Sequence, residues 1–258
     1  MKDTVRQVIN VVATLLVLVV NGLANSLPIN GQTSGEISDR FQVYFVPAGY
    51  VFSIWGLIYL ALIAFSIYQA LPAQRNNPHL RSIGYLYALS CVANAVWLFL
   101  WHYEIFVLTV FVMLALLLLL IAIYLRLGTG RTRVSAAETW LVRVPFSIYL
   151  GWITVATVAN VTTLLDYLNW GGWGLSPEAW AIIMLVAAAA IASAVSLTRG
   201  DIAYILVIVW AFVGIAVKQA ATPVVAWTAI LMAVVVALTL IVGVPRTRRR
   251  LRNLAAMA

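Results

Sequence analysis

Apolar and polar positions alternate along this chain in whole segments, and the pattern predicts membrane-spanning helices. Crossing the hydrocarbon core of a bilayer takes about 20 predominantly apolar residues. Stretches of that length recur from end to end, with short polar connections between them. We therefore predict eight spanning segments, at residues 8–27, 46–70, 83–101, 105–125, 137–165, 178–197, 202–217 and 222–242.

Composition agrees with this prediction and narrows the class of protein. Of the 258 residues, 64% are hydrophobic and 9% are charged, whereas soluble domains are about half apolar and a quarter charged. We predict an all-α, polytopic membrane helix bundle. The net charge of +8 does not indicate nucleic-acid binding, because the basic residues lie in short connections and at the C-terminus. Membrane lipids are the expected partners of these residues.

The basic residues also predict the orientation, since Lys and Arg concentrate in the cytoplasmic loops of membrane proteins. With eight spans, most of them fall on one side: Lys2, Arg6, Arg75, Arg81, Arg126, Arg131, Arg133, Arg199, Arg246, Arg248, Arg249, Arg250 and Arg252. The other side receives a small mixed set: Glu36, Asp39, Arg40, Glu104, Asp166 and Lys218. We therefore expect both termini to be cytoplasmic, and a bacterial inner membrane fits this arrangement.

An aromatic stripe begins the second predicted helix. After Pro47 come three aromatic residues, Phe52, Trp55 and Tyr59. The first two are three residues apart and the last two are four apart, so all three share one face of a helix. Small residues lie about a quarter-turn away, at Gly49, Ser53 and Gly56. Such spacing favours close approach of a neighbouring helix in lipid. This helix is therefore expected both to pack closely and to form one wall of a pocket.

The third and fifth predicted helices carry matching stripes. The third presents Tyr87, Asn94, Trp97 and Trp101, and the fifth presents Tyr149, Trp152, Ala156 and Asn160, with Pro145 one turn earlier. A pocket shared by the three helices and opening on the non-cytoplasmic side explains the match. Packing aromatics are the alternative. An amide in the hydrocarbon region needs a hydrogen-bond partner. A hydrogen bond from Asn94 to another helix is therefore the preferred expectation, and contact of Asn94 with a ligand is the alternative.

Other polar features have simpler expectations. Trp101, Trp170, Trp173 and Trp180 are expected to form an interfacial belt, His102 to be solvated at the interface, and Glu138 and Arg143 to extend toward the headgroups. The connection over residues 28–44 is either a solvated linker or a lid over the pocket. The sequence contains no phosphate-binding loop, metal-spaced His/Cys set or nucleophile elbow. We expect no catalytic residues, no metal site and no enzyme activity.

Taken together, the three stripes resemble the TspO/MBR family, the tryptophan-rich sensory proteins related to the mitochondrial translocator protein. The resemblance rests on the run from Pro47 to Tyr59, on Asn94 to Trp97, and on Tyr149 to Asn160. It covers the first five helices. It implies a TspO-like five-helix core over residues 1–170, and the chain adds a C-terminal extension of about three helices over residues 171–258. A basic residue shortly after Tyr167, as a sterol signature would need, is missing.

The resemblance implies a pocket that binds porphyrins such as haem, or other apolar ligands, beneath the loop between the first two helices. The ligand-binding residues implied in this way are Pro47, Phe52, Trp55, Tyr59, Asn94, Trp97, Tyr149, Trp152, Ala156 and Asn160. No cofactor is required, although a bound porphyrin, haem or lipid is expected. A role in binding or sensing tetrapyrroles, with some relation to transport, is the leading hypothesis.

Two other roles stay open at this point. One is a structural or accessory subunit of a larger membrane complex, in which the aromatic faces simply pack and the last three helices dock a partner. The other is a facilitative transporter, although no repeat between halves and no pair of broken helices is visible in the sequence. A homodimer is compatible with each of these roles.

Overall fold

The computed structural model of the chain describes residues 2–27 and 29–256, so Pro28, the first residue of the predicted linker or lid, lies outside the described residues. Within that part of the chain the secondary structure is entirely helical. The predicted all-α membrane bundle is confirmed.

Eight long helices correspond one for one to the eight predicted segments. They are α1 (Lys2–Ser26), α3 (Ile54–Ala70), α5 (Leu86–His102), α6 (Phe106–Arg126), α8 (Val144–Tyr167), α9 (Pro177–Arg199), α10 (Ile202–Lys218) and α11 (Pro223–Ala256). Three short helices lie between them: α2 (Ser34–Asp39), α4 (Pro78–Ile83) and α7 (Ala136–Glu138). The 3₁₀ helices are η1 (Ile29–Gly31), η2 (Gly49–Ser53), η3 (Pro72–Gln74) and η5 (Gly172–Gly174), and η4 (Thr139–Arg143) is a π-helix.

Among the described residues, six helices are long and apolar enough to cross a membrane, while α5 and α10 are apolar but shorter, with 17 residues each. The predicted end of the last span at residue 242 is too early, because α11 continues through Pro245 and the basic residues for 34 residues in all. At about 1.5 Å per residue it is about 50 Å long, well beyond the ~30 Å hydrocarbon core. Its basic end therefore projects past the apolar region.

The start of the fifth span has an irregular turn with a local cause. The π-helix η4 directly precedes α8, and Pro145 lies in the first turn of α8. Proline has no backbone N–H and cannot continue the i→i−4 pattern of hydrogen bonds. A widened turn just before it accommodates the missing donor, so α7, η4 and α8 run as one span over Ala136–Tyr167.

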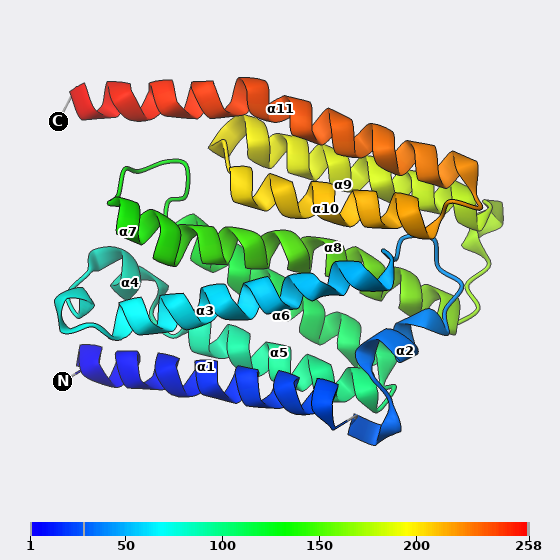
Figure 1. Cartoon of the computed structure of the whole chain (residues 1–258), viewed down its shortest axis with the longest axis horizontal. Helices are drawn as coiled ribbons and strands as arrows, with labels where there is room; N and C mark the ends of the chain where they lie inside the picture. The colour runs from blue at the N-terminus through cyan, green and yellow to red at the C-terminus, as the bar shows by residue number, and fades with distance from the viewer. Residues whose placement is uncertain (1, 28, 257–258) are drawn as a thin grey trace.

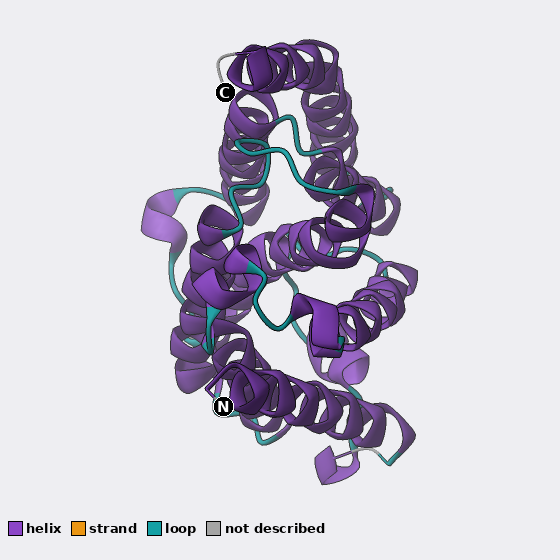
Figure 2. Cartoon of the chain, turned by 90° about the vertical axis from the view of Figure 1, so that its left-hand side faces the viewer, coloured by secondary structure: helices purple, strands orange, loops and turns teal. Residues whose placement is uncertain are grey.

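The helices run roughly parallel and antiparallel along one direction, and both termini lie at the same end (Figure 1). We call this the termini end and the opposite end, where α2 lies, the α2 end. Viewed from the termini end, α1 and the end of α11 lie at opposite edges (Figure 2). One hydrophobic core nevertheless joins buried residues of α1, α3, α5, α6 and α8 to those of α9, α10 and α11.

The expectation of close helix approach at Gly49 and Gly56 is wrong, because nothing lies within 4 Å of a Cβ built at either position. Close approach occurs instead at two glycines of the C-terminal helices. A Cβ at Gly214 would lie 2.2 Å from Val51 Cγ2, and one at Gly243 would lie 2.2 Å from the Ser196 carbonyl oxygen. The small residues that matter are therefore those of α10 and α11.

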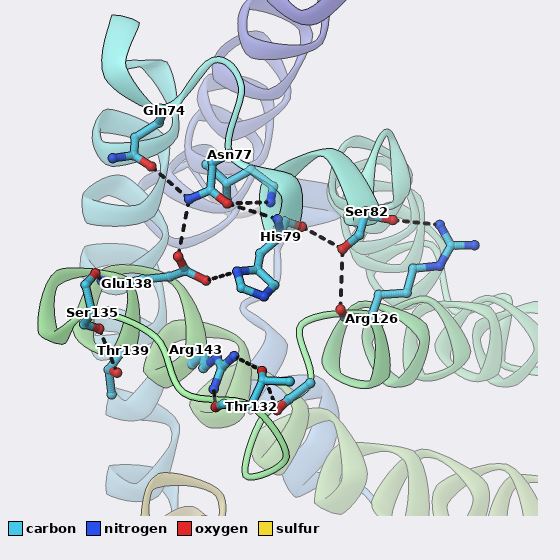
Figure 3. Close-up of polar contacts among 12 residues, drawn as sticks. Gln74, Asn77, His79, Ser82, Arg126, Thr132, Ser135, Glu138, Thr139 and Arg143 are labelled. Atoms are coloured by element: carbon cyan, nitrogen blue, oxygen red, sulfur yellow. Dashed lines mark hydrogen bonds and ion pairs between the residues drawn. The ribbon is translucent and has the colours of Figure 1, made fainter. Parts of the chain in front are cut away.

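Glu138 and Arg143 do not extend toward lipid headgroups as expected. Both residues are buried, and Figure 3 shows Glu138 directed toward Asn77 and His79 and Arg143 directed toward Thr132. Glu138 lies 2.8 Å from His79 Nδ1 and accepts a hydrogen bond from Asn77 Nδ2 at 3.2 Å. Protein groups of the segment around α4, rather than lipid, therefore surround the Glu138 carboxylate.

Candidate functional site

A cavity of about 390 Å³ lies at the α2 end between α3, α5 and α8, beneath the segment that contains α2. Its volume falls within the range of about 300–1,000 Å³ that is typical of small-molecule sites. Eight of the ten residues singled out from the sequence line it: Pro47, Phe52, Trp55, Tyr59, Trp97, Trp152, Ala156 and Asn160. The structure therefore brings the three stripes together around one space.

The aromatic rings form walls of fixed mutual geometry. Trp55 stacks on Tyr59 with ring centroids 5.5 Å apart, and Trp55 meets Trp152 edge to face at 6.2 Å. Phe52 also packs edge to face against Trp152, at 5.6 Å. Such arrangements are the favoured ones for aromatic pairs. The rings of α3 and α8 thus hold each other in place and leave faces free beside the cavity.

The remaining two singled-out residues, Asn94 and Tyr149, do not line the cavity. Asn94 Oδ1 accepts a hydrogen bond from Asn21 Nδ2 at 2.9 Å, and Asn94 Nδ2 donates to the Tyr149 hydroxyl at 3.1 Å. These bonds join α1, α5 and α8, as expected for an amide that must find its partner inside the membrane. Tyr149 in turn packs against Trp55 at 6.1 Å. Asn94 therefore supports the aromatic wall from behind.

Asn160 has both a structural and a lining position. Its Nδ2 donates to Thr109 Oγ1 on α6 at 3.0 Å, and its Oδ1 accepts from Trp97 Nε1 at 3.4 Å. The amide therefore fixes the Trp97 ring relative to α6 and α8, while the residue still contributes to the cavity wall.

The connection over residues 29–44 is folded over the cavity rather than being a simple linker. Thr33 caps α2 in a reciprocal capping box with Glu36, and four residues of this segment line the cavity: Thr33, Ser34, Gly35 and Ser38. Arg40 lies 2.9 Å from Glu104, which also accepts a hydrogen bond from Gln32 Nε2 at 3.0 Å. We call residues 29–44 the lid.

The exposure predicted from the sequence is wrong for two residues at the end of α5. Trp101 was assigned to an interfacial belt, but it is 5% exposed, stacks on Trp97 at 5.5 Å and lines the cavity. His102 was expected to be solvated, but it is fully buried, with Nδ1 2.8 Å from the Leu98 carbonyl oxygen. The lid buries both residues. The only available signal was the offset of four between Trp97 and Trp101.

Helix α10 and the residue that follows it contact the backbone on both sides of Pro47, between the lid and α3. The Ala48 N–H donates to the Gly214 carbonyl oxygen at 3.0 Å, and Trp210 Nε1 donates to the Val51 carbonyl oxygen at 3.2 Å. Farther along, Gln219 Nε2 donates to the Tyr44 carbonyl oxygen at 3.2 Å. The start of α3 and the end of the lid are therefore attached to α10.

Comparison with protein families identifies the chain. A family described as TSPO-like protein matches residues 7–242. The chain belongs to the TSPO-like family. Comparison with curated proteins found no significant match, and neither did comparison with solved structures. The protein is thus a TSPO-like, multi-pass integral membrane protein, as the helices of the described residues also indicate.

The TSPO-like match continues well past residue 170 and includes α9, α10 and most of α11. The division at residue 170 stays a prediction. The contacts of α10 with the lid and with the start of α3 mean that any division of the TSPO-like chain must keep these two parts in contact.

Proposed function

We propose that this TSPO-like protein binds a flat, largely apolar ligand of the tetrapyrrole class in the cavity under the lid. The observation that carries the proposal is the convergence of stacked and edge-to-face aromatic rings from three helices on one cavity. Flat conjugated rings gain most from such surfaces, because stacking adds to the burial of apolar area.

Polar groups around the cavity suit a ligand with a few hydrogen-bonding atoms. No charged side chain is among the described residues that line the cavity. Carboxylates of a porphyrin would therefore have to lie at the lid, where Thr33, Ser34 and Ser38 offer hydroxyl groups. Trp152 Nε1 is buried without a hydrogen-bond acceptor among the described residues. A ligand nitrogen or oxygen is a natural partner for this N–H.

Titration of the purified protein with protoporphyrin tests the proposal. We expect a saturable shift of the porphyrin Soret band. Ala156→Phe should weaken binding by at least about tenfold, because the new ring fills the cavity and displaces the ligand. Ala187→Phe is the matched control, since Ala187 lies at an exposed position of α9. Equal affinities for the two variants would contradict the assignment of the ligand to this cavity.

Orientation in the membrane is part of the same proposal. We propose that the termini end is cytoplasmic in a bacterial inner membrane and that the lid is on the opposite side. The positive-inside tendency supports this orientation, because the basic connections and both termini lie at one end. A reporter active only in the cytoplasm, fused after residue 258, should be active. An inactive reporter, with an active periplasmic one at the same position, would reverse the orientation.

A further inference from the structure

A second and larger cavity, about 940 Å³ in volume, is a groove that begins at the termini end and extends toward the start of α3, and no residue of the lid lines it. It is formed by α3, α8 and α10 together with the loop after α6 and the basic part of α11. Along α10 it extends from Ile202 to Trp210, which is about 12 Å at the rise of a helix. We call it the arginine groove.

One part of the arginine groove is strongly basic. Four arginines line it: Arg133, Arg143, Arg199 and Arg248. None of them makes an ion pair with a carboxylate in the part of the chain that the structure describes. Arg131 and Arg250 lie close enough to Arg199 to add to the positive potential there. This concentration of positive charge has no counterpart at the lid.

The groove arginines bond neutral carbonyls instead of carboxylates. Arg143 donates to the Thr132 carbonyl oxygen at 2.6 Å and to Thr132 Oγ1 at 2.5 Å, as Figure 3 shows. Arg199 donates to the Thr129 carbonyl oxygen at 3.3 Å. Arg250 bonds the Gly130 carbonyl oxygen. These bonds fix the loop that carries Arg133 but bring no negative charge, and among the described residues only Arg143 has a buried carboxylate, that of Glu138, near enough to offset part of its charge.

The one acidic residue of the groove does little to neutralise it. Asp201 is buried, and its carboxylate accepts hydrogen bonds from Ser147 Oγ at 2.6 Å and from the Tyr204 N–H at 3.1 Å. Burial raises the pKa of Asp201 above its ordinary value. The Nε atom of Arg143, in contrast, is buried and has no partner among the described residues.

The rest of the groove is apolar and opens sideways, where the bilayer would be. Leu57 is 51% exposed, Leu206 is 58% exposed, and Trp140 beside the arginines is 69% exposed. In a membrane these side chains contact lipid, and tryptophan is typical of the level of the headgroups. The arginine-lined part of the groove and its apolar part thus match the charged headgroup and the acyl chains of a phospholipid.

We propose that the arginine groove binds an anionic phospholipid, with its phosphate among the four arginines and an acyl chain along α3 and α10. Basic pockets between membrane helices are suited to such headgroups. The lipid supplies the missing negative charge and covers Leu57 and Leu206. Because loop 129–134 and the basic end of α11 both line the groove, the lipid also joins α8, α10 and α11 at the termini end.

Native mass spectrometry of the full chain in detergent, titrated with phosphatidylglycerol or phosphatidylcholine, tests the proposal. We expect tighter binding of phosphatidylglycerol. The double variant Arg133→Gln/Arg248→Gln should weaken it by about tenfold or more, since each lost charge at a membrane surface has an effect of about 1 kcal/mol. The matched control is Arg246→Gln/Arg249→Gln, which removes the same charge from α11 positions outside the groove lining.

A second pair of variants keeps the test valid if the double variant folds poorly. Ala203 lines the groove, whereas Ala190 is exposed on α9. Ala203→Phe should reduce phosphatidylglycerol binding, and Ala190→Phe should not. The proposal is overturned by equal affinity for the two lipids, or by equal loss in both arginine double variants. It is also overturned if inorganic phosphate or protoporphyrin displaces the lipid at equal concentration, since either would then be the occupant.

Discussion

The lid cavity lies at the α2 end, whereas the arginine groove has its arginines at the termini end (Figure 1) and extends along α10 to Trp210 and the start of α3, and the two differ in almost every physical property. The lid cavity is lined by six aromatic and two amide side chains, and its described lining contains no charged side chain. The arginine groove is larger, is open toward the bilayer and contains four arginines without ion-pair partners. One is suited to a flat apolar molecule and the other to an anionic amphiphile.

The two sites differ in the partners of their polar groups. Around the lid cavity, amides and hydroxyls bond each other across helices: Asn94 accepts a hydrogen bond from Asn21 and donates one to Tyr149. In the groove, guanidinium groups bond carbonyls, and their charge is left for a partner. Internally satisfied polar networks rigidify a site, whereas uncompensated charge indicates recognition.

Two glycine variants should give the largest effects, and each should weaken the binding of a different ligand. Gly214→Ala places a Cβ 2.2 Å from Val51 at the start of α3, so it should cost about 1–3 kcal/mol of stability and weaken porphyrin binding. Gly243→Ala forces α11 away from the Ser196 carbonyl of α9 and should cost a similar amount, but weaken phospholipid binding instead. Denaturation in mixed detergent micelles and the two titrations measure these effects.

The control for both glycine variants is Gly56→Ala. Nothing lies within 4 Å of a Cβ at Gly56, so this change should leave stability equal or slightly higher, because alanine is the better helix former. If each of the two variants weakened both ligands equally, the cavities would not be independent.

Salt should affect the two ligands differently. Raising the ionic strength from about 0.1 M to about 1 M shortens the Debye length from about 10 Å to about 3 Å. Phosphatidylglycerol binding should fall by about tenfold, whereas porphyrin binding should change by less than about twofold, because four arginines line the groove and no charged side chain is among the described residues that line the lid cavity. A parallel loss for both ligands would show that the basis of the comparison is wrong.

Loss of the amide behind the aromatic wall should have a moderate effect. Asn94→Leu removes the hydrogen bonds that Asn94 makes with Asn21 and with Tyr149, and should destabilise the protein by about 1–2 kcal/mol. Porphyrin binding should weaken by a few-fold, because Trp55 loses its support through Tyr149. Phospholipid binding should not change. A ligand contact by Asn94 itself would instead give a large loss of affinity with unchanged stability.

The smallest effect concerns pH and the lid. Hydrogen bonds from Gln32 and Arg40 hold the pKa of Glu104 below its usual value of 4.5. A lowered carboxylate pKa stabilises the folded lid above about pH 4.5, and this contribution disappears as the pH falls through the lowered pKa. At pH 6, Glu104→Gln should therefore speed amide hydrogen exchange over residues 29–40. As the pH is lowered below 4.5 the difference between the variant and the native protein should shrink steadily; a difference that does not shrink would exclude this cause.

Much of the fold could be predicted because it depends on local pattern. Segment length and hydropathy predicted eight helices, five of them with starts within three residues of those observed, and helical spacing placed Trp55, Trp97 and Trp152 beside one cavity. The exceptions have physical causes. The helix α11 continues past Pro245 into the basic residues, where Thr247 is buried and Arg250 bonds the Gly130 carbonyl oxygen, and such long-range contacts leave no hydropathy signal.

Hydropathy and periodicity were enough to predict a membrane helix bundle with three aromatic faces, since the spacing of residues along a helix sets which side chains share a face. Which of these faces meet depends on tertiary packing. It moved Trp101 from an expected belt into the cavity wall, buried His102 beneath the lid and attached the start of α3 to α10 through Gly214. It also gathered Arg133, Arg199 and Arg248, which the sequence presents as separate topology signals, into one groove. Contacts between residues far apart in the chain leave no periodic signal, so packing alone creates both cavities.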